Sequence, residues 1–176
     1  AAEAGSDFIV DSVFRPHRVT HCCMGTSCAI ADFDHNGKLT IWTQTQYPYN
    51  YKMDLAPALG MSPGDIRVIQ PPVGGAFGSK LDVYPYEPIA ALLARKTGRP
   101  VKVTFTREEE FKASPTRQTA IIHMRTGCRR DGTLTFRSAD VLLDNGAYTS
   151  WGPTIPVIMM RTTSGHYRVP VVEFKA

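Results

Sequence analysis

Residues 73–80 read V-G-G-A-F-G-S-K and separate a strand-like run from a helix-like run. Three glycines surround one large aromatic side chain, Phe77, and a lysine closes the stretch. Glycine adopts backbone conformations that other residues avoid, and it leaves the neighbouring N–H groups uncovered. Gly74, Gly75 and Gly78 therefore predict a sharp loop whose backbone can bind an anionic or oxo ligand. A tight crossover without any ligand explains the same glycines equally well.

Two familiar phosphate-binding loops do not fit this stretch. The Walker pattern needs Gly-Lys followed by Ser or Thr, whereas here Ser79 stands before Lys80 and Leu81 follows it. The dinucleotide-binding fingerprint needs the spacing G-x-G-x-x-G at the start of a helix, and the glycines at positions 74, 75 and 78 do not have it. The loop therefore belongs to neither class.

Composition sets the outer limits of the interpretation. The chain has 176 residues, of which 43% are hydrophobic, enough for one domain with a sizeable core. The net charge is +4, but the basic residues are scattered among 16 acidic ones, which argues against a nucleic-acid-binding stripe. There is no apolar run long enough to cross a membrane, and residues 1–7 lack the features of a signal peptide, so a cytoplasmic location is predicted.

The four cysteines, Cys22, Cys23, Cys28 and Cys128, do not have the spacing of a zinc site or of a disulfide framework. They are predicted to be free thiols that serve packing.

Strand-like segments recur along the chain. Asn36-Gly37 and Asp131-Gly132 are dipeptides typical of hairpin turns, so each predicts two antiparallel strands. In the strand after the second turn the apolar positions change face, which predicts a β-bulge near Arg137 or Ser138. The predicted strands are Phe8 to Val13, Ser27 to Phe33, Lys38 to Thr43, Ile66 to Ile69, Pro100 to Phe105, Thr119 to Cys128 and Thr133 to Leu143.

Two helices are predicted between these strands. The first covers residues 49–59 and ends at Gly60. The second begins at Pro88 and ends at Gly98. Its predicted buried face consists of Ile89, Leu92 and Leu93.

The segment from Gly146 to Tyr167 is apolar but interrupted by prolines, and it is predicted to be an irregular buried segment. Taken together, the segments predict an α+β fold, with a mixed sheet, long hairpins and two or three packed helices. Residues 1–176 are predicted to form a single domain.

Several polar residues are open to more than one interpretation. Gln46 is read from spacing alone as an exposed amide at a strand end. His21 is more typical of a packed, hydrogen-bonded histidine than of a catalytic one. Glu108, Glu109 and Glu110 are predicted to form a solvated helix face rather than an acid–base site.

The stretch V-G-G-A-F-G-S-K resembles the G-G-x-F-G-x-K loop of the molybdenum hydroxylases, the family of xanthine dehydrogenase, aldehyde oxidoreductase and aerobic carbon monoxide dehydrogenase. Within that family the chain looks most like the large subunit of 4-hydroxybenzoyl-CoA reductase. The likeness covers nearly the whole chain, in the order T-Q-T-Q-Y-P, A-P-A-L-G, I-R-V-I-Q-P-P, K-T-G-R-P-V-K-V, T-R-E-E-E-F and D-N-G-A-Y-T.

The resemblance implies that the chain supplies part of a site for molybdenum bound to molybdopterin, in the simple or the cytosine dinucleotide form. It implies that the backbone at Phe77 and Gly78 approaches the metal's oxo ligand and that Gln46 hydrogen-bonds near the same oxygen. The catalytic Glu of the family is expected downstream, so no catalytic and no metal-ligating residue is assigned within the chain. The implied cofactor-binding residues are Gln46, Gly74, Gly75, Ala76, Phe77 and Gly78.

The resemblance also implies partners. Members of the family are several times longer, so the chain is expected to be one fragment of a large subunit, inactive alone, that works with the remaining domains and with iron–sulfur and FAD partners. The implied substrate is an aldehyde, an N-heterocycle or an aromatic acyl-CoA. Purines are not expected, because Leu81 replaces the Glu that follows the loop lysine in purine-oxidising members. The alternative is a non-catalytic module that offers an anion-binding or assembly surface.

Overall fold

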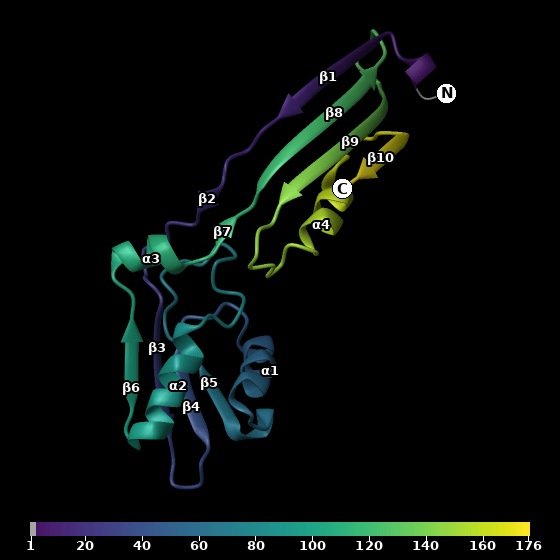
Figure 1. Cartoon of the computed structure of the whole chain (residues 1–176). Coiled ribbons are helices and arrows are strands. Elements are labelled where there is room, and N and C mark those ends of the chain that lie inside the picture. The colour runs from purple at the N-terminus through teal and green to yellow at the C-terminus, as the bar shows by residue number, and fades with distance from the viewer. Residues whose placement is uncertain (1–2) are drawn as a thin grey trace. The chain divides into compact units, whose positions relative to one another are not determined.

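The computed structural model describes residues 3–176, and the contacts along the chain divide it into two compact units. Thr20–Thr116 forms one unit, and the segments before and after it form the other (Figure 1). The chain passes between the units at the short strands β2 (Val19–Thr20) and β7 (Thr116–Arg117), which pair with each other. The α+β class with mixed sheets and long hairpins is confirmed, and each unit has its own four-stranded sheet.

The sheet of the unit Thr20–Thr116 has the strand order β5-β4-β3-β6. β3 and β4 are antiparallel, as the turn at Asn36-Gly37 predicts, and Gly37 has the positive φ of +76° that such a turn requires. β4 and β5 are parallel, so their carboxyl ends reach the same edge of the sheet. The strands are β3 (Cys28–Phe33), β4 (Leu39–Thr43), β5 (Ile66–Ile69) and β6 (Val101–Thr104).

Helices α1 (Pro48–Leu59) and α2 (Tyr86–Thr97) pack beside each other, α1 against β5 and α2 against β3 (Figure 1). Both end where the sequence predicts, at glycines in the left-handed conformation, because glycine adopts a positive φ without steric cost. The unit also contains the 3-10 helix η2 (Pro63–Asp65) and helix α3 (Arg107–Ala113). The buried core is formed mainly by Ala31, Leu39, Ile41, Tyr51, Leu55, Ala56, Leu59, Ile66, Ala90, Ala91 and Ala94.

The predicted buried face of α2 is wrong. Ile89, Leu92 and Leu93 are all exposed, whereas Ala90 and Ala94 lie in the core. The helix packs closely against the sheet, and alanine is small enough to allow that approach while the longer side chains point outward. Size at the contact therefore decided the orientation of this helix, rather than hydrophobicity alone.

The sheet of the other unit has the order β1-β8-β9-β10, with β10 parallel to β9. The hairpin around Asp131-Gly132 is confirmed, since β8 and β9 pair antiparallel over most of their length. This unit also contains the 3-10 helix η1 (Glu3–Gly5) and helix α4 (Ile155–Thr162). The strands are β1 (Phe8–Phe14), β8 (Thr119–Cys128), β9 (Leu134–Asp144) and β10 (Val171–Lys175).

The position of the predicted bulge is wrong. The pairing is regular at Arg137 and Ser138, and the register shifts instead between Gly127 and Cys128, where Thr135 is the extra residue. The change of buried face has another cause: the ring of Phe136 lies directly over Gly127, which has no side chain to keep it away.

The prediction for Gly146 to Tyr167 is also wrong. The segment includes α4, and no residue of this helix is buried within the part of the chain described. No helix within residues 3–176 is long and apolar enough to span a lipid bilayer.

Candidate functional site

The glycine loop, residues 73–80, follows the carboxyl end of β5 and has an unusual backbone. Gly74, Gly75 and Gly78 have φ of +68°, +96° and +97°, and Phe77 has φ of +53°. Within residues 3–176 the N–H groups of Gly75, Ala76 and Phe77 donate to no acceptor. Successive amides in a turn with positive φ values form a concave group of donors that attracts anions and oxo groups. The loop therefore offers three free backbone donors in a row.

Gln46, just beyond β4, is the predicted residue that the structure brings against the loop. Its Oε1 atom accepts a hydrogen bond from the Gly78 N–H at 3.1 Å. Its own N–H donates to the carbonyl oxygen of Lys80 at 2.9 Å. Main chain and side chain of Gln46 are thus both fixed to the loop, and in this arrangement its NH₂ group has no acceptor among the described residues and can donate to a ligand.

The three glycines are needed for different reasons. A Cβ atom on Gly74 would lie 2.9 Å from the Cα of Gly25, so Gly74 is required by close packing of backbone on backbone. A Cβ on Gly78 would meet only the Nε2 atom of His21, at 3.8 Å. Gly74 is therefore needed for packing whether or not a ligand binds, and the cofactor-binding roles of Gly74 and Gly78 stay predictions.

Phe77 is 77% exposed, although phenylalanine is among the residues most often buried. Its ring lies over Gly75, with Cε2 3.1 Å from the position of a Cβ there. The left-handed backbone at Phe77 turns the ring away from the core. Single exposed hydrophobic side chains are common, so the exposure of Phe77 matters here for its place beside the free amide donors.

His21 lies beside the same loop. Its Nδ1 atom is buried and makes no hydrogen bond within the described residues. Buried polar atoms without a partner are rare, and each calls for an explanation. The expectation of a packed, hydrogen-bonded histidine is therefore wrong at Nδ1, and the Nε2 atom of His21 lies near Gly78.

The sequence did not suggest the roles of two cationic side chains near the loop. Lys80 belongs to the loop, and Arg107 binds the neighbouring segment at Cys23 and Met24. Lys80 is only 3% exposed, and its burial lowers the pKa of its ammonium group. Arg107, at the start of α3, donates to the carbonyl oxygens of Cys23 and Met24, both at 2.7 Å. Both residues lie within stretches that carry the family resemblance, but nothing in their spacing reveals these contacts.

The predicted solvated face is confirmed for Glu108 and Glu109, which are exposed, and wrong for Glu110. Glu108 is exposed and Glu109 caps α3 by accepting from the N–H of Thr106, whereas Glu110 is buried. The carboxylate of Glu110 accepts hydrogen bonds from the N–H and the hydroxyl of Ser27. That partner is far away in sequence, so charge patterning could not identify it.

A second buried carboxylate, Glu87, lies at the start of α2. It accepts hydrogen bonds from the Thr43 hydroxyl at 2.5 Å and from the Tyr84 N–H at 2.7 Å. Burial raises its pKa to about 7, and these hydrogen bonds partly offset the effect. The hydroxyl of Tyr51 lies close enough to lower this pKa, although it makes no hydrogen bond of regular geometry.

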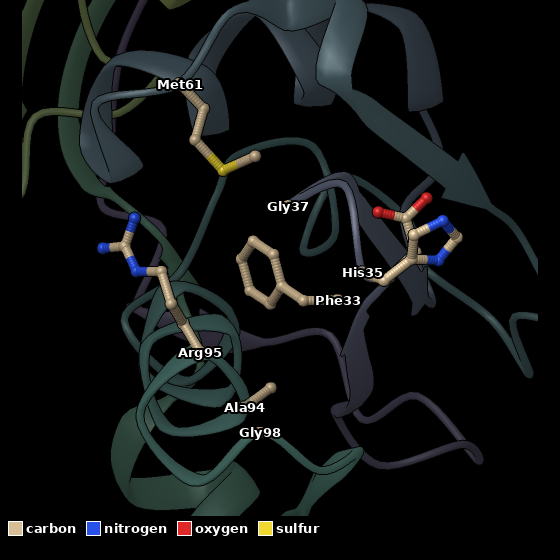
Figure 2. A pocket seen from close by; sticks show the side chains of 8 residues that line it. Phe33, His35, Gly37, Met61, Ala94, Arg95 and Gly98 are labelled. Carbon is tan, nitrogen blue, oxygen red and sulfur yellow. The ribbon is translucent and has the colours of Figure 1, made fainter.

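A cavity of about 510 Å³ lies at the other end of the same sheet, where β3 ends and β4 begins. Figure 2 shows the side chains of Phe33, Met61 and Arg95 facing one another across it. None of the predicted cofactor-binding residues lines this cavity. Arg95 donates to the carbonyl oxygen of Leu59, a bond that caps the end of α1.

Comparison with known proteins agrees with the loop geometry. The family model for the molybdopterin cofactor-binding domain matches residues 1–176. The chain belongs to this family. The domain is 33% identical over 176 residues to the nicotinate dehydrogenase large molybdopterin subunit of Eubacterium barkeri, covering 100% of this chain and 41% of the relative. It is 40% identical over 151 residues to the putative xanthine dehydrogenase molybdenum-binding subunit of Escherichia coli (strain K12), covering 85% of this chain and 20% of that subunit.

Solved structures show the same fold. The aldehyde oxidoreductase from Desulfovibrio gigas superposes with a TM-score of 0.91 at 24% identity, over 98% of this chain and 19% of that one. The quinoline 2-oxidoreductase from Pseudomonas putida 86 gives a TM-score of 0.86 at 30% identity, over 98% of this chain and 22% of that one. The domain thus spans less than half the length of the relatives it matches.

Proposed function

We propose that this domain contacts the molybdopterin cofactor in an oxidoreductase of the molybdenum hydroxylase type. The observation that carries the proposal is the glycine loop, in which three consecutive N–H groups find no acceptor among the residues that the structure describes, beside the Gln46–Gly78 hydrogen bond. A molybdenum centre with oxo ligands and a pterin with a phosphate group both present oxygens to such donors. The donor set of the loop therefore fits the group that the family is named for.

The residues of the domain would act by binding and orienting. The free N–H of Phe77 and the NH₂ group of Gln46, which the Gly78 N–H holds in place, would donate to an oxygen of the cofactor. The free N–H groups of Gly75 and Ala76 would donate to further oxygens, and Gly74 would shape the loop. The exposed ring of Phe77 would exclude water, which strengthens hydrogen bonds at its side. When bound, the cofactor supplies the metal centre that exchanges electrons with the substrate.

The wider assignment extends the same proposal. The domain would be part of a longer large subunit that supplies the catalytic Glu, working with iron–sulfur and FAD partners in the cytoplasm. The substrate would be an aldehyde, an N-heterocycle or an aromatic acyl-CoA. Relatives named for nicotinate and quinoline support the N-heterocyclic class. The relative named for xanthine dehydrogenase, at 40% identity, adds purines to the candidate N-heterocycles, whereas Leu81, which carries no charge, favours a substrate other than a purine.

The test uses the full-length protein with its partner subunits. We expect the purified wild type to contain molybdenum and pterin, each in a molar amount close to that of the large subunit. Gln46→Ala and Gly78→Val should lower both the molybdenum content and the turnover. The measurements are metal analysis by mass spectrometry, pterin fluorescence after oxidation, and steady-state rates.

Matched controls separate cofactor binding from folding. Gln70→Ala changes an exposed glutamine that precedes the loop, and it should leave the molybdenum content at the wild-type level. Gly98→Val introduces a similar backbone strain at the end of α2, where φ is +62° and no atom lies within 4 Å, so it should lower stability alone. Wild-type protein without molybdenum, or normal turnover in both loop variants, would leave the anion-binding or assembly module as the better interpretation.

A further inference from the structure

The ammonium group of Lys80 is buried, and all three of its hydrogen-bond acceptors among the described residues are neutral. Its Nζ atom donates to the carbonyl oxygens of Gly25 and Val73, both at 2.9 Å, and to the Oε1 atom of Gln44 at 3.2 Å. An ammonium group has three N–H donors and no acceptor, so each donor has one neutral oxygen. Two backbone carbonyl groups and one side-chain amide therefore satisfy all three donors of the ammonium group, and all three are neutral.

The three acceptors belong to three separate segments, which Lys80 joins. Val73 and Lys80 are the two ends of the glycine loop, so the bond between them closes the loop. The bond to Gly25 is reinforced by the Gly25 N–H, which donates to the carbonyl oxygen of Gly74 at 2.9 Å. The carbonyl oxygen of Lys80 accepts from the N–H of Gln46. A single residue thus fixes the loop and also the backbone of the glutamine that contacts Gly78.

The positive charge of Lys80 is not neutralised by a direct partner. Within residues 3–176 Lys80 takes part in no ion pair. The buried carboxylate of Glu110 is bound to Ser27, at 2.6 Å from its N–H, and it acts on Lys80 only through space, where its charge raises the pKa of the lysine against the effect of burial. The guanidinium of Arg107 adds a second cation behind the same segment. Charges in a buried, low-dielectric setting act over longer distances than charges in water.

We propose that Lys80 is a positioning residue that holds the glycine loop in its donor-presenting form and places a fixed positive charge behind the free amides. This charge favours the more negative state of an oxygen-rich group bound at the loop. For a metal centre held there, it stabilises the reduced form and raises the reduction potential. The inference rests on the proposed function, since it assumes that the bound group is the molybdenum cofactor.

The experiment compares Lys80→Met with Lys112→Met in the full-length protein with its partner subunits. Lys112 is the matched control, because its side chain is 70% exposed and its partner is Glu108 on the same helix turn. The first readout is hydrogen–deuterium exchange of the peptide that contains residues 73–80. We expect exchange there to be about tenfold faster or more in Lys80→Met, because the loop loses three bonds, and unchanged in Lys112→Met.

The second readout is the midpoint potential of the bound molybdenum, measured by a redox titration followed by electron paramagnetic resonance. We expect a shift to lower potential in Lys80→Met, per bound metal, and none in Lys112→Met. A merely structural role would lower the molybdenum content while leaving the potential of the remaining metal at the wild-type value. That result, or an unchanged exchange rate, would overturn the inference.

A further variant covers the case in which Lys80→Met does not fold. Gln44→Leu removes one acceptor but keeps the charge, so loop exchange should rise while the potential stays at the wild-type value. A shifted potential, or exchange as slow as in the wild type, would contradict the proposal. Wild-type protein that contains no molybdenum would refute the proposed function instead, so the two failures are distinguishable.

Discussion

Replacing Glu87 with glutamine should remove a pH-dependent term from the stability of the unit Thr20–Thr116. Glu87 is almost completely buried at the start of α2, where the Thr43 hydroxyl and the Tyr84 N–H donate to its carboxylate. Glutamine has nearly the same shape, and its carbonyl oxygen can accept one of these bonds. The substitution therefore removes the ionisable group with little change in packing.

The magnitude follows from the pKa of Glu87, which burial raises from 4.5 to about 7. Because the folded protein binds this proton more tightly than the unfolded chain, the stabilisation is fully present below pH 4.5 and is lost as the pH rises to about 7. At about 1.4 kcal/mol per pKa unit, the free energy of unfolding should fall by about 3 kcal/mol across this range. In Glu87→Gln this contribution is absent.

The assay is urea unfolding at a series of pH values from 4 to 8, followed by tryptophan fluorescence. The assay uses the 176-residue chain, in which Trp42 lies on β4 in the same unit, and Trp151→Phe in both proteins makes Trp42 the sole tryptophan of these residues. The difference in unfolding free energy between Glu87→Gln and the parent should change in favour of the variant by about 3 kcal/mol as the pH rises. A difference that stays constant with pH would refute the reasoning.

Three other substitutions test the packing described above. Gly74→Ala should cost about 2 kcal/mol or more in urea unfolding, against about 1 kcal/mol for Gly98→Ala, because a Cβ at position 74 meets backbone while position 98 is open. Thr106→Ala removes the bond from the Glu109 N–H to the Thr106 hydroxyl in the capping box of α3, but it keeps the backbone N–H that donates to the Glu109 carboxylate. It should lower the unfolding free energy by about 1 kcal/mol, measured the same way. Leu92→Ala should cost under about 1 kcal/mol, whereas Leu55→Ala in the core should cost about 2–5 kcal/mol; equal thermal shifts would contradict the orientation of α2.

Much of the fold is local in origin and could be predicted from the sequence. The turns at Asn36-Gly37 and Asp131-Gly132 set both hairpins, since their residues favour the backbone that a tight turn needs. The glycines that end α1 and α2 act through their own φ values. The orientation of α2 and the exposure of α4 depend on what each helix meets in space, which no short-range pattern specifies.

In the candidate site, too, the features with a local cause could be predicted from the sequence, and those that depend on distant partners could not. The sharp loop and its free amides follow from glycines that act through the backbone, whereas the approach of Gln46 was expected only from the family resemblance. The buried side chains of Lys80 and Glu110 were not predicted, because both are charged and their partners are neutral groups from other segments. Charged residues are usually exposed, so burial of this kind becomes visible only in the structure.

The burial of the Lys80 side chain makes it a probe of loop opening. Amine-acylating reagents modify lysines at the surface, and this one becomes accessible only when the loop separates from its neighbours. The extent of labelling at Lys80, compared with that at Lys112 in the same sample, therefore counts how often the loop opens. A footprinting experiment on intact protein could follow cofactor insertion or loss in time, without a spectroscopic signal from the metal.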